Sequence, residues 1–221
     1  MTFSAIITAA GKNSRMRQDQ IDRNIEVKNK LTLDFENSTV IQTTIENALS
    51  LNIDECIVVL GHYASQIKEA INDNIKDKIK FVVNEPVDVG LSMSLLNGLT
   101  NTKSEYALCI TGDQPTVTAQ TFENIIETLK KSPNPDRTIS VLRRLETGKL
   151  DTAEGLGMPF AANRENLIDY LKNENDNLNP ILRKMFNNGY DFYGVKELNR
   201  NELININHHD DYLKCSNKKK K

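Results

Sequence analysis

Short, nearly continuous apolar runs alternate with amphipathic segments along much of the chain. Their length and their content of β-branched residues favour β-strands at 3–8, 56–60, 79–83, 106–111 and 138–142. A strand that is apolar on both faces is typical of a mainly parallel sheet with helices on each side. The pattern therefore predicts the α/β class, with a three-layer α/β/α arrangement.

The segments between these runs carry apolar side chains at helical spacing. Such stripes over 40–49, 67–71 and 122–129 predict helices that pack one face on the sheet. Parallel strands need crossover connections of this kind, so the helices agree with the predicted sheet.

After residue 142 the pattern thins, and only caps and turns guide the prediction. Asn163 can cap a helix that runs to about Leu171. Asn179 followed by a proline is an N-cap signal, and Gly189 can end that second helix. We predict a late strand over 190–195.

The chain of 221 residues fits one large α/β domain, and no Pro/Ser/Gly linker divides it. We expect a single domain over 1–213 and a basic tail over 214–221 without fixed structure. The net charge of −2 gives no reason to expect nucleic acid or an anionic membrane as partner.

Three further features suggest where the protein works. No apolar run approaches the ~20 residues of a membrane-spanning helix. The N-terminus lacks the basic start of a signal peptide, and three cysteines do not make a disulfide framework. We expect a cytoplasmic protein that is a monomer or a weak homodimer.

The predicted strand 3–8 leads into the loop Ala9-Ala10-Gly11-Lys12-Asn13-Ser14-Arg15-Met16. Ligands of open α/β sheets bind beyond the carboxyl ends of strands. Backbone amides of this loop can cradle an anion, and Lys12 and Arg15 can neutralise phosphate oxygens. The loop is not a P-loop, because Ile6 replaces the first glycine, and it lacks the glycines of a dinucleotide fingerprint. An ordinary strand-to-helix loop is the alternative.

Several later segments add glycine, proline and polar residues in a fixed order. They are Lys30-Leu31-Thr32-Leu33, Ser38-Thr39-Val40-Ile41, Asn84-Glu85-Pro86, Gly90-Leu91-Ser92-Met93-Ser94-Leu95, Gly112-Asp113-Gln114-Pro115, Gly157-Met158-Pro159-Phe160 and Ile206-Asn207-His208-His209-Asp210. Together with the first loop they resemble the MobA-like branch of the nucleotidyltransferase superfamily over nearly the whole chain. The first loop and the Gly/Ser segment are most similar to molybdenum cofactor cytidylyltransferases.

This resemblance implies a Rossmann-like nucleotidyltransferase fold, also called GT-A-like, and a reaction that needs Mg²⁺. An acceptor phosphate would attack the α-phosphorus of a nucleoside triphosphate, and pyrophosphate would leave. CTP is the favoured donor, and a molybdopterin-type phosphate is the favoured acceptor. GTP as donor, or a sugar phosphate, choline phosphate or phospholactate as acceptor, stays open. A non-catalytic nucleotide-binding regulatory protein is the alternative from another class.

The resemblance also assigns roles to individual residues. Catalysis would depend on Arg15, Lys30 and Asp113, with Asp113 as metal ligand and the neutral Asn207 as a weaker second ligand. The residues implied in nucleotide binding are Ala9, Ala10, Gly11, Lys12, Asn13, Lys30, Gly90, Ser92, Ser94 and Asp113. Those implied in acceptor binding are Gln114, Gly157 and Pro159. Plain turns at the Asp113 and Pro159 segments are the alternative.

The chain departs from the family pattern at several places; Arg17 stands where glycine is usual, and Asn13 takes the position of the usual serine. About eight extra residues, 18–25, precede the lysine segment, and they can form a lid over the phosphates or leave Lys28 as the true phosphate partner. Asn207 and His208 stand where aspartate and threonine are usual. A zinc site in the His-His-Asp-Asp run 208–211, or a plain surface loop, is the alternative there.

Overall fold

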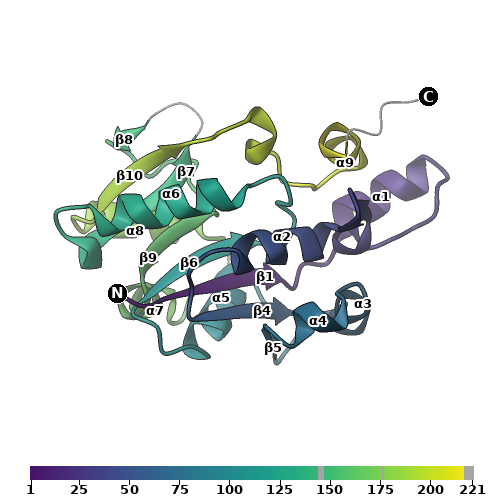
Figure 1. Cartoon of the computed structure of the whole chain (residues 1–221), viewed down its shortest axis with the longest axis horizontal. Coiled ribbons are helices and arrows are strands. Elements are labelled where there is room, and N and C mark those ends of the chain that lie inside the picture. Colours follow the sequence, from purple (N-terminus) through teal and green to yellow (C-terminus); the bar gives the residue numbers. More distant parts are fainter. Residues whose placement is uncertain (144–146, 176, 217–221) are drawn as a thin grey trace.

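The structure is a computed structural model that describes residues 1–143, 147–175 and 177–216. The strands of its central sheet within these residues are β1 (Phe3–Ala9), β4 (Glu55–Leu60), β5 (Lys80–Val83), β6 (Tyr106–Thr111), β7 (Thr138–Arg143), β8 (Gly148–Lys149), β9 (Phe160–Asn163) and β10 (Asp191–Lys196). They lie in the order β5–β4–β1–β6–β9–β7–β10–β8 (Figure 1). A separate small hairpin pairs β2 (Asp34–Phe35) with β3 (Ser38–Thr39).

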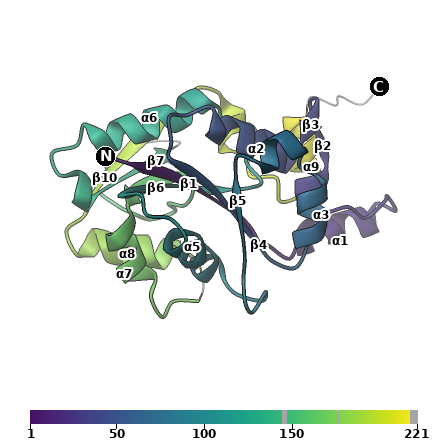
Figure 2. The same cartoon turned by 60° about the horizontal axis from the view of Figure 1, so that its bottom comes forward.

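Helices cover both faces of the sheet, which gives the three layers seen in Figure 2. One face carries α2 (Val40–Leu49) and α6 (Ala119–Lys130), and the other carries α5 (Leu91–Thr100), α7 (Arg164–Leu171) and α8 (Asn179–Asn187). The remaining helical segments are α1 (Ser14–Asp22), η1 (Lys30–Thr32), α3 (Ala64–Glu69), α4 (Asp73–Lys76), η2 (Pro135–Arg137), η3 (Arg200–Leu203) and α9 (His209–Cys215). Among the described residues no helix is both long and apolar enough to cross a membrane.

The central strand β1 shows why the sheet needs both helical layers. All of its residues are buried. Ala5 and Ile7 belong to the core shared with α2 and α6, whereas Ile6, which points the other way, belongs to the core under α5, α7 and α8. Apolar side chains on both faces of a strand leave water only when both faces are covered. The predicted three-layer α/β fold is confirmed.

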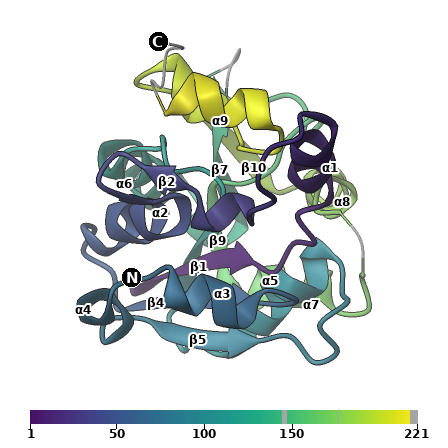
Figure 3. The same cartoon turned by 90° about the vertical axis from the view of Figure 1, so that its right-hand side faces the viewer.

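Parallel pairing determines where the strands end. β1 is parallel to β4 on one side and to β6 on the other. In this register Thr8 lies opposite Thr111, so β1 and β6 end side by side at one edge of the sheet. The N–H of Gly112 donates to the carbonyl of Thr8 at 2.9 Å, so the hydrogen bonding between the two strands continues one residue past the end of β6. Figure 3 looks onto this carboxyl edge, where α1 and α9 lie.

The second half of the sheet contains a strand that the sequence did not predict. The four-residue strand β9 lies antiparallel between β6 and β7. Only its last residue, Asn163, was assigned a role, as a helix cap, and its side chain does accept from the N–H of Asn166 at 3.1 Å. A strand this short gives too few residues for an alternation pattern.

Two predicted boundaries were wrong. Leu178 precedes α8 as its N-cap, and Asn179 lies inside the helix. The Asn179 side-chain amide instead donates to the carbonyls of Ala153 and Leu156, both at 3.1 Å, and so ties a loop to the helix. At the other end α9 runs to a buried Cys215, so the folded domain passes the predicted limit at 213. Residues 217–221 of the predicted tail lie outside the described residues.

We expect Gly98→Ala to destabilise the fold, because Gly98 allows α5 to lie directly on the sheet. A Cβ atom at this position would stand 2.4 Å from Ile6 Cγ2 and 2.8 Å from Val59 Cγ2. Relief of this overlap should cost about 1–3 kcal/mol of unfolding free energy. Urea denaturation measures this as a lower midpoint with an unchanged slope.

The control for this prediction is Thr100→Ala, an exposed position of the same helix. It should change the unfolding free energy by less than ~0.5 kcal/mol. A Gly98→Ala variant as stable as the wild type would contradict the close approach of α5 to the sheet.

Candidate active site

The loops that follow β1 and β6 line one cavity at the carboxyl edge of the sheet. Its volume is about 310 Å³, at the lower end of the ~300–1,000 Å³ of ligand pockets. We name it the central cavity. The predicted site residues that line it are Ala9, Ala10, Gly11, Asn13, Arg15, Lys30, Ser94, Asp113 and Asn207.

Asn13 connects the first loop to the lysine segment. Its backbone has a φ of 57°, a left-handed conformation that asparagine tolerates well. Its side chain does not cap α1; the amide nitrogen donates to the carbonyl of Lys28 and the amide oxygen accepts from the N–H of Lys30, each at 3.1 Å. Asn13 therefore holds the backbone that presents Lys30 to the central cavity.

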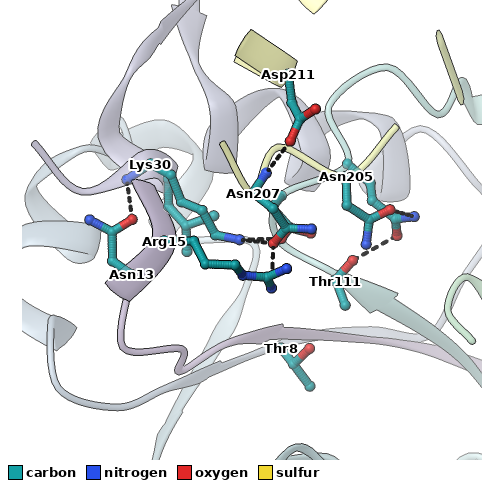
Figure 4. A network of polar contacts seen from close by, with 12 residues as sticks. Thr8, Asn13, Arg15, Lys30, Thr111, Asn205, Asn207 and Asp211 are labelled. Carbon is teal, nitrogen blue, oxygen red and sulfur yellow. Dashed lines mark hydrogen bonds and ion pairs between the residues drawn. The ribbon is translucent and has the colours of Figure 1, made fainter. Parts of the chain in front are cut away.

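Four polar side chains converge inside the central cavity, as Figure 4 shows for three of them. Lys30 Nζ forms an ion pair with Asp113 Oδ2 and also donates to Asn207 Oδ1 at 3.0 Å. Arg15 donates to the same Asn207 oxygen at 3.0 Å. Residues from four distant segments of the chain thus share one cluster, which we call the Lys30 cluster: Arg15, Lys30, Asp113 and Asn207.

Asp113 is the buried carboxylate of this cluster, with 8% of the residue exposed. Its Oδ1 atom is buried and has no hydrogen-bond partner among the described residues. A buried carboxylate oxygen without a partner is costly, and a cation can remove that cost. Asp113 is also held firmly, since its carbonyl accepts from the N–H of Ile206 at 3.0 Å.

These residues fit a magnesium ion better than a zinc ion. Mg²⁺ binds through one or two protein oxygens, waters and substrate phosphates, and Asp113 and Asn207 supply a carboxylate oxygen and an amide oxygen. Zinc needs several nitrogen, sulfur or carboxylate ligands. The described part of the chain has no group of three His, Cys, Asp or Glu residues placed to hold a metal. The alternative zinc site at 208–211 therefore has no support.

The segment 18–25 does not extend across the central cavity as a free lid. Residues 18–22 continue α1, and this helix packs against α9 (Figure 3). Asp19 Oδ2 lies 3.0 Å from His208 Nδ1 and accepts from the N–H of His209 at 3.0 Å, while Arg23 pairs with Asp210 at 2.9 Å. The N–H of His209 is the largest cause of a lowered pKa at Asp19.

The contact between α1 and α9 positions two members of the Lys30 cluster. Arg15 lies on α1, and Asn207 directly precedes His208, the N-cap of α9. Asp211 closes a capping box, because its carboxylate accepts from the N–H groups of Asn207 at 3.2 Å and His208 at 2.8 Å. Lys28, the alternative phosphate partner, pairs with Glu26 and does not line the cavity.

Three residues predicted to bind nucleotide lie outside the cavity lining. Lys12 is exposed and forms an ion pair with Asp88 at 2.7 Å. The N–H of Gly90 donates to Asn175 Oδ1 at 2.6 Å. Ser92 is fully buried and donates to the carbonyl of Glu174 at 3.0 Å, so its hydroxyl does not face the central cavity.

Ser94, on the next turn of α5, does reach the central cavity. It donates to the carbonyl of Gly90 at 3.1 Å and accepts from Asn84 Nδ2 at 2.9 Å. Asn84 is itself buried and accepts from Asn97 at 3.0 Å. Asn84 therefore orients the hydroxyl, a role that sequence reasoning did not assign to it.

A second cavity, of about 530 Å³, adjoins the first and shares Leu91, Thr111 and Asn205 with it. The predicted acceptor residues Gln114, Gly157 and Pro159 all line this cavity. The polar atoms of Gln114 are engaged in holding loops. Its oxygen accepts from Thr111 at 2.8 Å, and its nitrogen donates to the Met158 carbonyl at 3.2 Å and to Asn205 at 3.0 Å. Gln114 thus shapes the second cavity and fixes Asn205 between the two.

Glu202 supports the loop that carries Asn205 and Asn207, a role that no pattern in the sequence indicates. It is fully buried. Its carboxylate accepts from Thr118 N–H at 3.0 Å, Thr118 Oγ1 at 2.8 Å, Thr121 Oγ1 at 2.9 Å and Leu198 N–H at 2.8 Å. An acidic residue in a polar loop is normally exposed, so only the tertiary structure reveals this role.

Residues 5–173 match the MobA-like NTP transferase domain. The chain belongs to this family. A solved nucleotidyl transferase from Methanothermobacter thermautotrophicus is 41% identical, with 98% of this chain and 96% of that chain covered and a TM-score of 0.89. The fold is therefore the predicted Rossmann-like nucleotidyltransferase fold.

Two more distant proteins are also similar to this chain. A Mycobacterium tuberculosis protein, 22% identical, covers 98% of both chains with a TM-score of 0.72, and another structure of it is a complex with manganese. The bifunctional protein GlmU of Francisella tularensis subsp. novicida is 28% identical over 157 residues, or 71% of this chain. The chain spans about 30% of the length of that curated relative.

We expect Glu202→Gln to destabilise the fold although the side chains have the same shape. The carboxylate accepts hydrogen bonds from four N–H or O–H groups. A glutamine amide would turn its own N–H₂ group toward at least one of these donors. A buried donor left without an acceptor costs about 1–3 kcal/mol of unfolding free energy, measurable by urea denaturation. Glu127→Gln on exposed ion pairs of α6 is the control, with a loss below ~1 kcal/mol. Equal losses in both variants would contradict this role of Glu202.

Proposed function

We propose that this protein is a metal-dependent nucleotidyltransferase. It would transfer a nucleoside monophosphate, CMP from CTP in the first place, to a phosphate-bearing acceptor such as molybdopterin cofactor and release pyrophosphate. One observation carries the proposal: the cations Arg15 and Lys30, the loop 9–11 and the carboxylate of Asp113 line a single cavity that opens into a second one.

The central cavity would bind the triphosphate. The amides of the loop 9–11 lie at the end of β1, where they can meet phosphate oxygens. Arg15 and Lys30, which line the same cavity, supply positive charge. This arrangement stabilises the charge that develops on the leaving pyrophosphate.

Asp113 and Asn207 are the residues that would hold Mg²⁺. The unpartnered Oδ1 of Asp113 and the amide oxygen of Asn207 fit this role. When bound with the nucleotide, the ion would neutralise phosphate charge that the two protein cations do not reach. Since Asn207 is neutral, Asp113 would be the dominant ligand.

The reaction needs positioning more than proton transfer. An oxygen of the acceptor phosphate forms a bond to the α-phosphorus, and the bond from that phosphorus to the α,β-bridging oxygen breaks. The electron pair leaves with pyrophosphate. A phosphate monoester is already ionised at neutral pH, so its oxygen can attack without a general base, and alignment of the two substrates supplies much of the rate enhancement.

The second cavity is the proposed acceptor site. It is lined by both apolar side chains, such as Leu142, Leu156 and Met158, and polar ones, such as Gln114 and Arg143. It meets the central cavity at Thr111 and Asn205, so an acceptor phosphate bound there would lie beside the α-phosphate. Other acceptors, such as a sugar phosphate, choline phosphate or phospholactate, and GTP as donor, are the second candidates for the same chemistry.

The nucleotide preference can be tested with a thermal-shift panel of CTP, GTP, ATP and UTP, each with Mg²⁺. A ligand that binds only the folded state raises the melting temperature. We expect CTP to give the largest increase, with Ser94 and the start of α5 beside the base. A larger increase with GTP would identify GTP as the donor in place of CTP. No increase in melting temperature with any nucleotide would contradict the proposal.

We expect Asp113→Ala to abolish pyrophosphate release from CTP while the fold survives. Loss of a group that stabilises developing charge typically lowers kcat by about 10²–10³-fold, measured by coupled detection of pyrophosphate over a panel of phosphorylated acceptors. Asp77→Ala, at the exposed C-cap of α4, is the control and should keep full activity. An active Asp113→Ala enzyme would remove Asp113 from the site. Nucleotide binding by the wild type without pyrophosphate release with any acceptor would favour the regulatory alternative.

A further inference from the structure

The ammonium group of Lys30 lies between the two groups that would hold the metal. Lys30 Nζ pairs with Asp113 Oδ2 and donates to Asn207 Oδ1 at 3.0 Å. Both side chains of the ion pair are largely buried, with 16% of Lys30 and 11% of Asp113 exposed. The ammonium therefore binds the same carboxylate, through its other oxygen, and the same Asn207 oxygen that would hold a divalent cation.

The charges in the Lys30 cluster disfavour a free divalent cation. Its described charged groups are two cations, Arg15 and Lys30, and one anion, Asp113. A divalent ion that reaches Asp113 meets the Lys30 ammonium at short range, in a buried place where charges are weakly screened. The metal and the ammonium therefore compete for Asp113.

A triphosphate reverses this balance. It brings excess negative charge into the same cavity and offers oxygens to Lys30 and to the metal together. The Lys30 head group can move toward them because it sits on a flexible four-carbon stem. Its backbone stays in place, since the N–H of Lys30 donates to Asn13 Oδ1 at 3.1 Å.

We propose that Lys30 occupies the metal position of the nucleotide-free protein and yields it only when a nucleoside triphosphate arrives. The metal then enters together with the nucleotide, as one complex, and Lys30 moves from Asp113 to the phosphates. The open Oδ1 of Asp113 gives the carboxylate a second oxygen for the incoming cation. This inference rests on the proposed function, because it assigns an order of binding to the same site.

The test is a Mn²⁺ titration of the full chain without nucleotide, followed by electron paramagnetic resonance of the unbound ion. Lys30→Met removes the charge and keeps much of the side-chain volume. We expect Lys30→Met to bind free Mn²⁺ at least tenfold more tightly than the wild type. Lys30→Arg keeps the charge and should bind as weakly as the wild type. In Lys30→Met combined with Asp113→Asn the gain should disappear.

Lys28→Met is the matched control, because Lys28 is an exposed lysine two residues away that pairs with Glu26 at 3.0 Å. It should leave Mn²⁺ affinity unchanged. If Lys30→Met fails to fold, Lys30→Gln gives the same test, since glutamine keeps a hydrogen-bond donor without the charge. Equal Mn²⁺ affinity of the wild type and the neutral Lys30 variant would overturn the inference, as would a gain that persists without Asp113.

Failure of this inference can be told apart from failure of the proposed function. If the wild type binds free Mn²⁺ tightly and still gains thermal stability with CTP and Mg²⁺, Lys30 does not occupy the metal position, but the proposed nucleotide site is retained. If no nucleotide raises the melting temperature of the wild type, the proposed function itself fails, whatever the metal affinities are.

Discussion

The parallel pairing of β1 with β6 is the constraint on which the site depends. Because Thr8 lies opposite Thr111, the loop with Gly11 and the turn with Asp113 leave the sheet at neighbouring points of one edge. Both loops are therefore close to the central cavity where they leave their strands. The strands themselves are buried on both faces by two apolar cores. The rigid sheet thus positions the loops that carry the site residues, as is usual in open α/β folds.

Around this edge the chain balances charge within a small volume. Asp113 is buried and is neutralised by Lys30, while Asn207 accepts from both Lys30 and Arg15. Carboxylates outside the cavity hold this arrangement, since Asp19 binds the start of α9 and Asp211 caps the turn that carries Asn207. The asparagine at 207 therefore has a defined place in the cluster, where it lowers the negative charge that a metal ion would meet.

Some parts of this structure could be predicted from the sequence and others could not. Long apolar strands and striped helices were predictable because burial on both sheet faces leaves a pattern over many residues, as in β1 and α2. The short strand β9 and the role of Asn179 could not be predicted, because the segments to which they form hydrogen bonds lie far away in the sequence. The motif residue Asp113 lines the central cavity, and the family resemblance pointed to this position. Asn84, Asp19 and Glu202 act through tertiary hydrogen bonds and leave no local pattern.

The proposed function requires one cleft to hold a metal–triphosphate between the loop after β1 and the carboxylate after β6. The decisive experiment is anomalous X-ray scattering from Mn²⁺ in crystals grown with a non-hydrolysable CTP analogue. We expect a manganese peak bonded to an oxygen of Asp113 and to phosphate oxygens, with the phosphates against residues 9–11. A metal peak remote from Asp113, or a nucleotide seated away from the loop after β1, would contradict it.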